Sequence, residues 1–124
     1  MPSLSIFEDE LAICSLQSEE CIPEVFARSS FCSYTRTRDG ISLIVTLQHV
    51  PEGVEPVERW RALQLEDRVV LGQRLDLAWV AKALSEANID CLALSTFSAD
   101  YVLVRSIDLH SAAAALRSSG CTVR

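Results

Sequence analysis

A hairpin near the C-terminus constrains the fold of this chain most strongly. Residues 95–104 read Ser-Thr-Phe-Ser-Ala-Asp-Tyr-Val-Leu-Val, so an apolar strand enters a short polar turn with one carboxylate, and a second apolar strand leaves it. Segments with helical spacing of apolar residues lie on both sides of this hairpin. From Trp60 onward the order is therefore strand, helix, strand, strand, helix, strand. This is the ferredoxin-like βαββαβ pattern, which predicts an α+β fold.

Both predicted helices of this second half have recognisable ends. The first has apolar residues at helical spacing over residues 77–87, and Asn88 follows where a left-handed residue commonly ends a helix. For the second helix, Asp108 is expected to cap the N-terminus, and Gly120 marks the end. The nearly continuous apolar run over residues 89–97 predicts a strand that is covered on both faces.

The first half repeats part of this pattern. Its predicted elements are a strand, a short helix and two further strands, over residues 11–16, 22–28, 31–37 and 41–47. Asp39-Gly40 predicts a tight turn between the last two strands, because glycine readily adopts positive φ. Pro51, Gly53 and Pro56 then mark a linker. We therefore expect a first, abbreviated unit plus linker over residues 1–55 and a complete unit over residues 56–124.

Charge and hydropathy exclude several classes of partner. The net charge is −6 and Lys82 is the only lysine, so the basic face that nucleic-acid binding needs is missing. No apolar run reaches the roughly 18 residues of a membrane span. The first residues lack the basic and apolar regions of a signal peptide. We expect a cytoplasmic protein with no nucleic-acid or membrane partner.

The cysteines indicate neither a disulfide framework nor a metal site. Their number is odd and none are spaced as CxxC: Cys14, Cys21, Cys32, Cys91 and Cys121. We expect buried, reduced thiols, with Cys21 the most exposed. The chain also lacks the sequence motifs of nucleophilic, nucleotide-dependent and zinc enzymes, so we expect no catalytic residues, no metal and no cofactor.

The polar turn and the entry to the first long helix are candidate binding elements. A free amino acid presents an ammonium group, which Asp100 can hold through a charge-assisted hydrogen bond. The loop before the helix offers backbone N–H groups to the ligand carboxylate, and we assign this role to Val70, Leu71 and Gly72. The alternative for Asp100 is an ordinary turn residue that bonds its own backbone.

Two further residues of the hairpin have open roles. Thr96 is either a hydrogen-bond donor in the pocket or a strand hydroxyl that is satisfied locally. Phe97 is either a packing residue or a ligand contact. Both are included among the candidate ligand-binding residues because they adjoin the turn.

The hairpin block Thr-Phe-x-x-Asp-Tyr-x-Leu-Val, preceded by a strand and a helix, resembles the ACT-domain family. Residues 33–42 resemble the first-domain hairpin of a group that includes the CASTOR-type amino-acid sensors and small bacterial two-ACT proteins. The resemblance implies tandem ferredoxin-like ACT units, the first abbreviated. It also implies a regulatory or sensor role, homodimers, and a free amino acid bound at the interface between ACT units, with Asp100 helping to hold it.

The helix entry departs from the family pattern. Residues 72–76 read Gly-Gln-Arg-Leu-Asp, without the small Thr-Gly step that the resemblance leads us to expect. The alternative function is therefore a dimerisation or protein-interaction module whose pocket has degenerated and binds no ligand.

Overall fold

Two units, each with its own hydrophobic core, make up the fold. The computed structural model describes residues 2–56, 58–66 and 75–124. We call Met1–Glu8 together with Arg61–Arg124 the complete unit, and Asp9–Trp60 the reduced unit. This division differs from the expected ranges 1–55 and 56–124 chiefly at the N-terminus, whose first eight residues pack with the second half of the chain.

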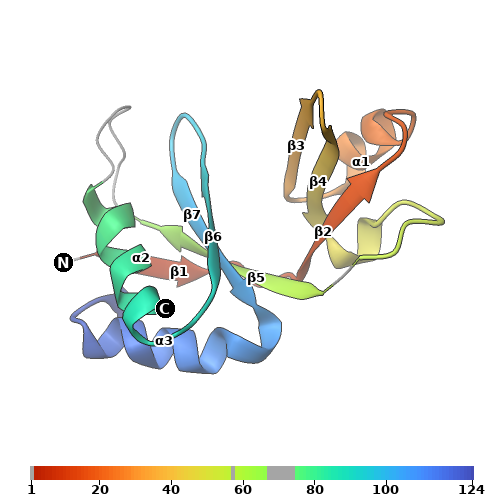
Figure 1. Ribbon diagram of the computed structural model, residues 1–124. Coiled ribbons are helices and arrows are strands. Elements are labelled where there is room, and N and C mark those ends of the chain that lie inside the picture. Colours follow the sequence, from red (N-terminus) through yellow and green to blue (C-terminus); the bar gives the residue numbers. More distant parts are fainter. Residues whose placement is uncertain (1, 57, 67–74) are drawn as a thin grey trace. The chain divides into compact units, whose positions relative to one another are not determined.

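The complete unit has the predicted βαββαβ order and one additional strand. Its elements are β1 (Ser3–Ile6), most of β5 (Arg59–Leu65), α2 (Leu75–Glu86), β6 (Cys91–Ser95), β7 (Asp100–Arg105), the 3₁₀ turn η2 (Ser106–Asp108), α3 (Leu109–Ser118) and β8 (Thr122–Val123) (Figure 1). Its strands are ordered β8-β1-β5-β7-β6. Strand β1 lies antiparallel to β5 and parallel to β8, so it is inserted between the first and last strands of the motif.

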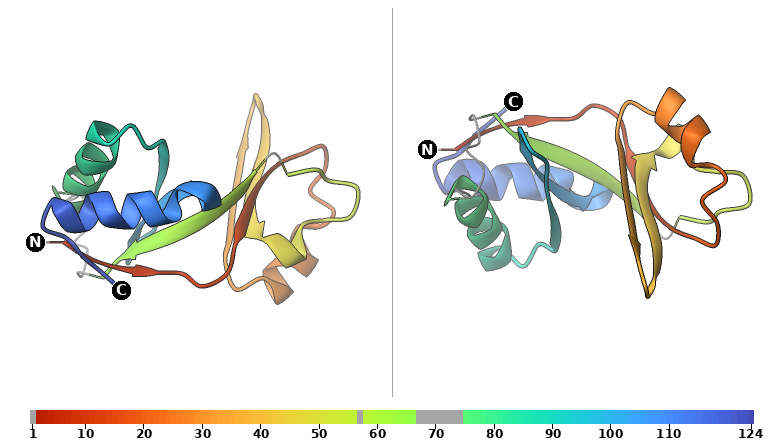
Figure 2. Two further views of the ribbon diagram at one scale, coloured as in Figure 1. Left: turned by 90° about the horizontal axis from the view of Figure 1, so that it is seen from below. Right: turned by 90° about the horizontal axis from the view of Figure 1, so that it is seen from above.

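A single core joins the sheet of the complete unit to α2 and α3. Val80 and Leu84 of α2 and Leu116 of α3 are fully buried, and they belong to one cluster with Val102 and Val104 of β7. Figure 2 shows both helices on the same side of β1 and β5. The apolar stripes read from the sequence therefore face the sheet, as helical spacing predicts.

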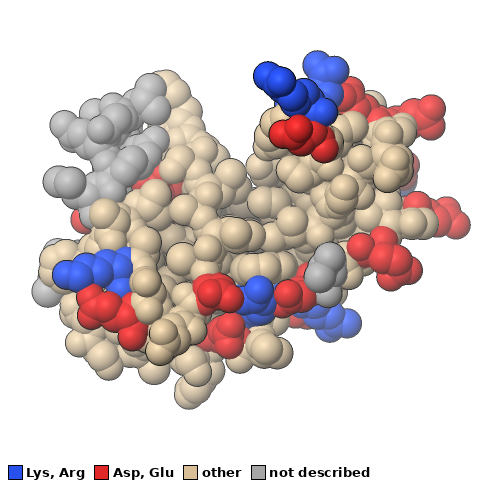
Figure 3. Space-filling view, viewed as in Figure 1, with Lys and Arg blue, Asp and Glu red and all other residues tan. Residues whose placement is uncertain are grey.

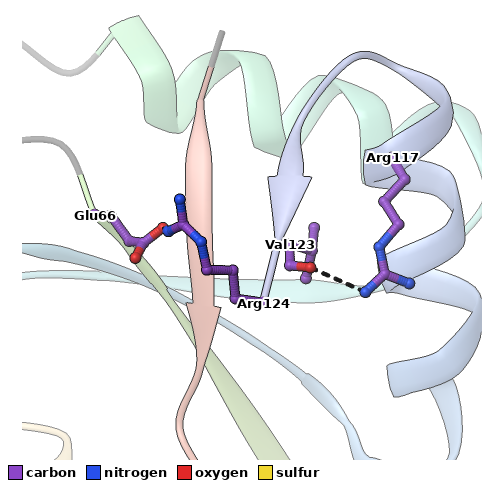
Figure 4. Close-up of polar contacts among 4 residues, drawn as sticks. All are labelled: Glu66, Arg117, Val123 and Arg124. Atoms are coloured by element: carbon purple, nitrogen blue, oxygen red, sulfur yellow. Dashed lines mark hydrogen bonds and ion pairs between the residues drawn. The ribbon is translucent and has the colours of Figure 1, made fainter.

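The C-terminal residues are tied to the rest of the complete unit (Figure 4). The Arg117 guanidinium donates a 3.0 Å hydrogen bond from Nη2 to the carbonyl oxygen of Val123. Arg124 forms an ion pair with Glu66, just after β5. These contacts hold β8 in place beside β1, where it forms the last strand of the predicted βαββαβ pattern.

The reduced unit has the same strand order but only one helix. It contains β2 (Leu11–Leu16), α1 (Ile22–Arg28), β3 (Cys32–Thr37), β4 (Gly40–Thr46), the 3₁₀ turn η1 (Leu47–His49) and the start of β5. The strands are ordered β3-β4-β2-β5, all antiparallel. Where the complete unit has α3, this unit has only the three-residue η1, as the predicted abbreviation implies.

Local details confirm some predictions and correct others. Asn88 has φ +59°, so the left-handed helix end is confirmed. The turn before β4 consists of Arg38 and Asp39, with Gly40 at φ +147° as the first strand residue. Asp108 precedes α3 but makes no side-chain capping bond, so its predicted cap is wrong. The helix entry is instead shaped by η2, which runs directly into α3.

The predicted two-sided cover of the strand before the hairpin is also wrong. Strand β6 covers only Cys91–Ser95, and its pairing within the described part of the chain is with β7 alone. Leu92 is 42% exposed. An edge strand with apolar side chains gives the same sequence pattern as a buried central strand, and this explains the error.

Candidate functional site

The hairpin between β6 and β7 is closed by a four-residue turn. Ser95 pairs with Asp100, and Thr96 to Ala99 form the loop between them. Within this loop the Thr96 N–H donates to the Ala99 carbonyl oxygen at 2.8 Å. The Thr96 hydroxyl donates to the same oxygen at 2.9 Å and accepts the Ala99 N–H at 3.0 Å. Thr96 therefore stabilises the turn, and its hydroxyl is satisfied locally, which is the second of the two roles considered for it.

Asp100 lies on β7 rather than in the turn. It is the first residue of that strand and only 2% exposed. Side chains alternate along a strand, so Asp100 shares a face with Val102 and Val104, which belong to the core under α2 and α3. The carboxylate is thus directed toward the interior of the complete unit, whereas a residue of an exposed turn would face solvent.

Phe97 occupies the opposite situation. It lies in the turn and is 80% exposed, so it makes no contribution to the core of a single chain. A large exposed aromatic side chain at a hairpin tip is available to a ligand or a partner. Val70, Leu71 and Gly72, the candidate carboxylate-binding residues, lie outside the described residues. Helix α2 begins at Leu75, with Asp76 in its first turn.

Sequence reasoning missed a second polar region, in the reduced unit. A cavity of about 480 Å³ lies beside α1 and η1, and its lining residues are Glu20, Cys21, Glu24, Val25, Arg28, Gln48, His49, Val50, Pro51 and Glu52. Next to it runs a chain of hydrogen bonds. His49 Nδ1 lies 2.7 Å from Thr46 Oγ1, which lies 2.9 Å from Ser29 Oγ.

This polar chain fixes the start of η1. Thr46 is buried, its N–H donates to Ser29 Oγ at 3.1 Å, and Ser29 Oγ donates to the carbonyl oxygen of Phe31. His49 is half-buried, whereas His110, on α3, is exposed. Contacts between residues 17 positions apart leave no local signal in the sequence.

The remaining polar features were compared with the requirements of a metal site and of a basic surface. Among the residues that the structure describes, no group of three or more His, Cys, Asp or Glu side chains is arranged to hold a metal ion. All five cysteines are free thiols. On the face drawn in Figure 3, Lys and Arg side chains are scattered among Asp and Glu and form no continuous basic patch. None of the described helices is long and apolar enough to cross a membrane.

With this geometry established, comparison with known families identifies the class of protein. The sequence profile described as "ACT domain" matches residues 55–118, just over half of the chain. The chain therefore belongs to the ACT domain family. Domains of this family are typically regulatory domains that bind small ligands. The matched range contains α2, β6, β7 and α3, and thus the whole of the candidate hairpin.

Solved structures with the same fold extend the comparison to both units. A protein of Agrobacterium tumefaciens is 27% identical, with a TM-score of 0.86, and the match covers 99% of this chain and 92% of that one. A Vibrio cholerae protein of unknown function, described as a possible transport protein, is 16% identical, with a TM-score of 0.75 and coverage of 91% and 85%.

A third structure has a stated role. The ligand-free regulatory subunit of aspartate kinase from Thermus thermophilus is 9% identical, with a TM-score of 0.64, and 97% of each chain is covered. At this identity the likeness concerns the fold. No curated protein matches the chain.

Proposed function

We propose that this chain is a regulatory or sensor protein that binds a free amino acid at the interface between ACT units and has no catalytic activity of its own. The observation that carries the proposal is the ACT domain match over residues 55–118, since this range includes the hairpin with the buried Asp100. The likeness to a regulatory subunit of aspartate kinase supports the regulatory part.

In the proposed site, two different elements bind the two charged groups of the amino acid. Asp100 binds the ammonium group, and the backbone ahead of α2, at Val70, Leu71 and Gly72, binds the carboxylate. Because the Asp100 side chain is almost fully buried, its attraction for a cation is strong only where the cation also leaves bulk water. The proposal therefore favours a ligand that becomes enclosed when it binds.

We further propose that the reduced unit is a second ACT unit, as in the small two-ACT proteins related to the CASTOR-type sensors, and that the chain works in the cytoplasm as a homodimer. The exposed edge strand β6, with Leu92 and the nearby Phe97, supports dimer formation, because an uncovered apolar edge is normally paired or protected. Light scattering at micromolar concentration tests this: a species of twice the 13.7 kDa chain is expected, and a monomer alone contradicts it.

A thermal-shift screen of the full chain against all common free amino acids tests ligand binding. A ligand at 100 times its dissociation constant adds about 2.7 kcal/mol to the free energy of unfolding, which raises the melting temperature by several degrees. At least one amino acid should give such a shift. If no amino acid raises the melting temperature, the proposal that the chain binds a free amino acid is wrong.

The second candidate function is a dimerisation or protein-interaction module with no ligand. It is favoured by the Thr96 hydroxyl, which is used inside its own turn, and by the 80% exposure of Phe97. A stable dimer combined with no thermal shift for any amino acid would support this alternative over the sensor.

A further inference from the structure

The hydrogen bonds of the polar chain in the reduced unit run in one direction. The Ser29 hydroxyl has a single proton and donates it to the carbonyl oxygen of Phe31, which can only accept. In the 2.9 Å contact between Ser29 Oγ and Thr46 Oγ1, the donor is therefore Thr46. Because the one hydroxyl proton of Thr46 is directed at Ser29, Thr46 Oγ1 is an acceptor toward every other partner.

This direction determines which ring nitrogen of His49 is protonated. His49 Nδ1 lies 2.7 Å from Thr46 Oγ1, and because Thr46 accepts this hydrogen bond, Nδ1 carries the proton. Nε2 of the neutral ring then has a free lone pair. Nε2 forms no hydrogen bond within the described part of the chain, and it is not enclosed by protein atoms, so a molecule in solvent reaches it. His49 thus offers one hydrogen-bond acceptor to a ligand.

His49 lines the cavity of about 480 Å³ beside α1 and η1. This volume is in the range of small-molecule pockets. Part of the lining is apolar, since the buried Val25 meets Val50 and Pro51 there. Every lining residue belongs to the reduced unit, whereas the hairpin with Asp100 belongs to the complete unit. The cavity is therefore a different site from the one proposed for an amino acid.

Negative charge dominates the polar part of the lining. Glu20, Glu24 and Glu52 contribute three carboxylates, and Arg28 contributes one guanidinium. Arg28 already pairs with Glu24 at 3.7 Å, whereas Glu20 and Glu52 form no ion pair within the residues that the structure describes. With a neutral His49, the lining has a net charge of −2. A ligand that matches it is positively charged and donates hydrogen bonds.

We propose that this cavity binds a small organic dication of the class of short aliphatic diamines. One ammonium group donates a hydrogen bond to His49 Nε2. The carboxylates of Glu20 and Glu52 balance the two positive charges, and the methylene groups lie against Val25 and Pro51. An organic cation is favoured over a metal ion, because the described His, Cys, Asp and Glu side chains form no group of three that could hold a metal.

Calorimetric titration of the full native chain with 1,4-diaminobutane tests the site. The matched ligand control is 1,4-butanediol, which has the same length and also donates hydrogen bonds but has no charge. A saturable heat is expected for the diamine, with binding of the diol at least about tenfold weaker, because a hydrogen bond from a charged donor is the stronger one. No saturable heat for the diamine, or equal affinities for the two compounds, would overturn the proposal.

Three variants locate the bound diamine. His49→Asn keeps an N–H donor for Thr46 but has no atom in place of Nε2, so the affinity should fall about tenfold. The double variant Glu20→Gln/Glu52→Gln should weaken binding about three- to tenfold. Glu86→Gln is the matched control, because Glu86 is an exposed carboxylate of α2 in an i,i+4 ion pair, and the affinity should not change. Unchanged affinity in either cavity variant, or an equal loss in Glu86→Gln, would contradict the assigned site.

Nitrogen-15 NMR of the histidine rings tests the protonation of His49 without any substitution. His49 and His110 are the two histidines of the chain, and the exposed His110 serves as the internal reference. Neutral His49 should have its proton on Nδ1, and its Nε2 resonance should shift when 1,4-diaminobutane is added, while the His110 resonances stay in place. A proton on Nε2 of neutral His49, or equal shifts of both rings, would overturn the proposal.

Discussion

The complete and reduced units use the same strand order but cover their sheets differently. Helices α2 and α3 have 12 and 10 residues and supply aliphatic side chains to a core with the sheet. In the reduced unit, α1 has 7 residues and the second helix is replaced by the three-residue η1. Both cores include a buried thiol, and in the reduced unit a polar cavity lies beside the helix, at α1.

The difference shows what replaces a missing helix. Thr46 is buried at the point where the second helix would follow, and its hydroxyl is satisfied by Ser29 and His49. A buried hydroxyl without such partners would be costly. Short polar contacts therefore stabilise the reduced unit where the complete unit relies on helix packing. The two tryptophans allow separate tests, because Trp60 lies in the reduced unit and Trp79 in the complete unit.

The largest expected effect concerns the two cores. Leu116 and Leu43 are both fully buried, the first on α3 in a core that α2 and the sheet also line, and the second in a core that has α1 as its only helix. We expect Leu116→Ala to lower the free energy of unfolding by about 3–5 kcal/mol and Leu43→Ala by about 2–3 kcal/mol. The smaller loss follows because a core with a single short helix relaxes more easily around the cavity. Urea unfolding measures both free-energy changes. The fluorescence of Trp79 reports on the complete unit in a Trp60→Phe background, and that of Trp60 reports on the reduced unit in a Trp79→Phe background. Equal losses in the free energy of unfolding would contradict the difference between the two cores.

The next effect compares the two hairpins. Asp100→Asn should weaken amino-acid binding by about 1.5–3 kcal/mol, or ten- to a hundredfold, because a charge-assisted bond is lost. It should also lower stability by about 1–3 kcal/mol, since buried carboxylates depend on their polar partners. Asp39→Asn, in the exposed turn before β4, is the matched control and should change stability by less than about 0.5 kcal/mol. Calorimetry and urea unfolding measure the two quantities.

A smaller effect tests the polar chain of the reduced unit. Thr46→Val keeps the shape of the side chain but removes the hydroxyl that contacts Ser29 and His49. The expected loss is about 1–2 kcal/mol in the unfolding of the reduced unit, followed by Trp60 fluorescence. Thr35→Val, on the exposed part of β3, should be nearly neutral. Similar losses of stability in Thr46→Val and Thr35→Val would contradict a stabilising role of the polar chain.

The smallest effect concerns the rates at which the cysteines react with a thiol reagent, which compare the accessibility of their sulfur atoms. Near neutral pH, Cys21 should react first with iodoacetamide. Burial, reinforced by the charge of Asp90, raises the pKa of Cys91, so less thiolate is present at a given pH and its labelling should accelerate toward alkaline pH. Mass spectrometry of partly labelled protein gives the order. Rapid labelling of Cys91 or of the buried Cys121 at neutral pH would contradict the assigned burial.

Local signals in the sequence predicted most of the fold. The helix over residues 22–28 and the left-handed Asn88 follow from short-range rules, and both are confirmed. Strand β1 was missed because its four residues carry almost no periodic signal. It is held by β5 and β8, which lie more than 50 positions away in the sequence. Propensity rules do not contain such long-range pairing.

The candidate site was less predictable than the fold. The composition of the hairpin was clear, but its turn begins at Thr96 and ends at Ala99, so Asp100 is the first residue of β7 and not a turn residue. The side chain therefore points to the core. The polar chain from Ser29 to His49 arises from packing of separate elements, so only the folded structure brings its residues together.

Calorimetric titration of the full chain with each common free amino acid tests the central claim most directly. We expect a saturable heat for at least one amino acid, an affinity reduced ten- to a hundredfold in Asp100→Asn, and an unchanged affinity in Asp39→Asn. The absence of saturable heat for every amino acid, in protein that is folded by circular dichroism, would contradict the claim that this ACT domain protein is an amino-acid sensor.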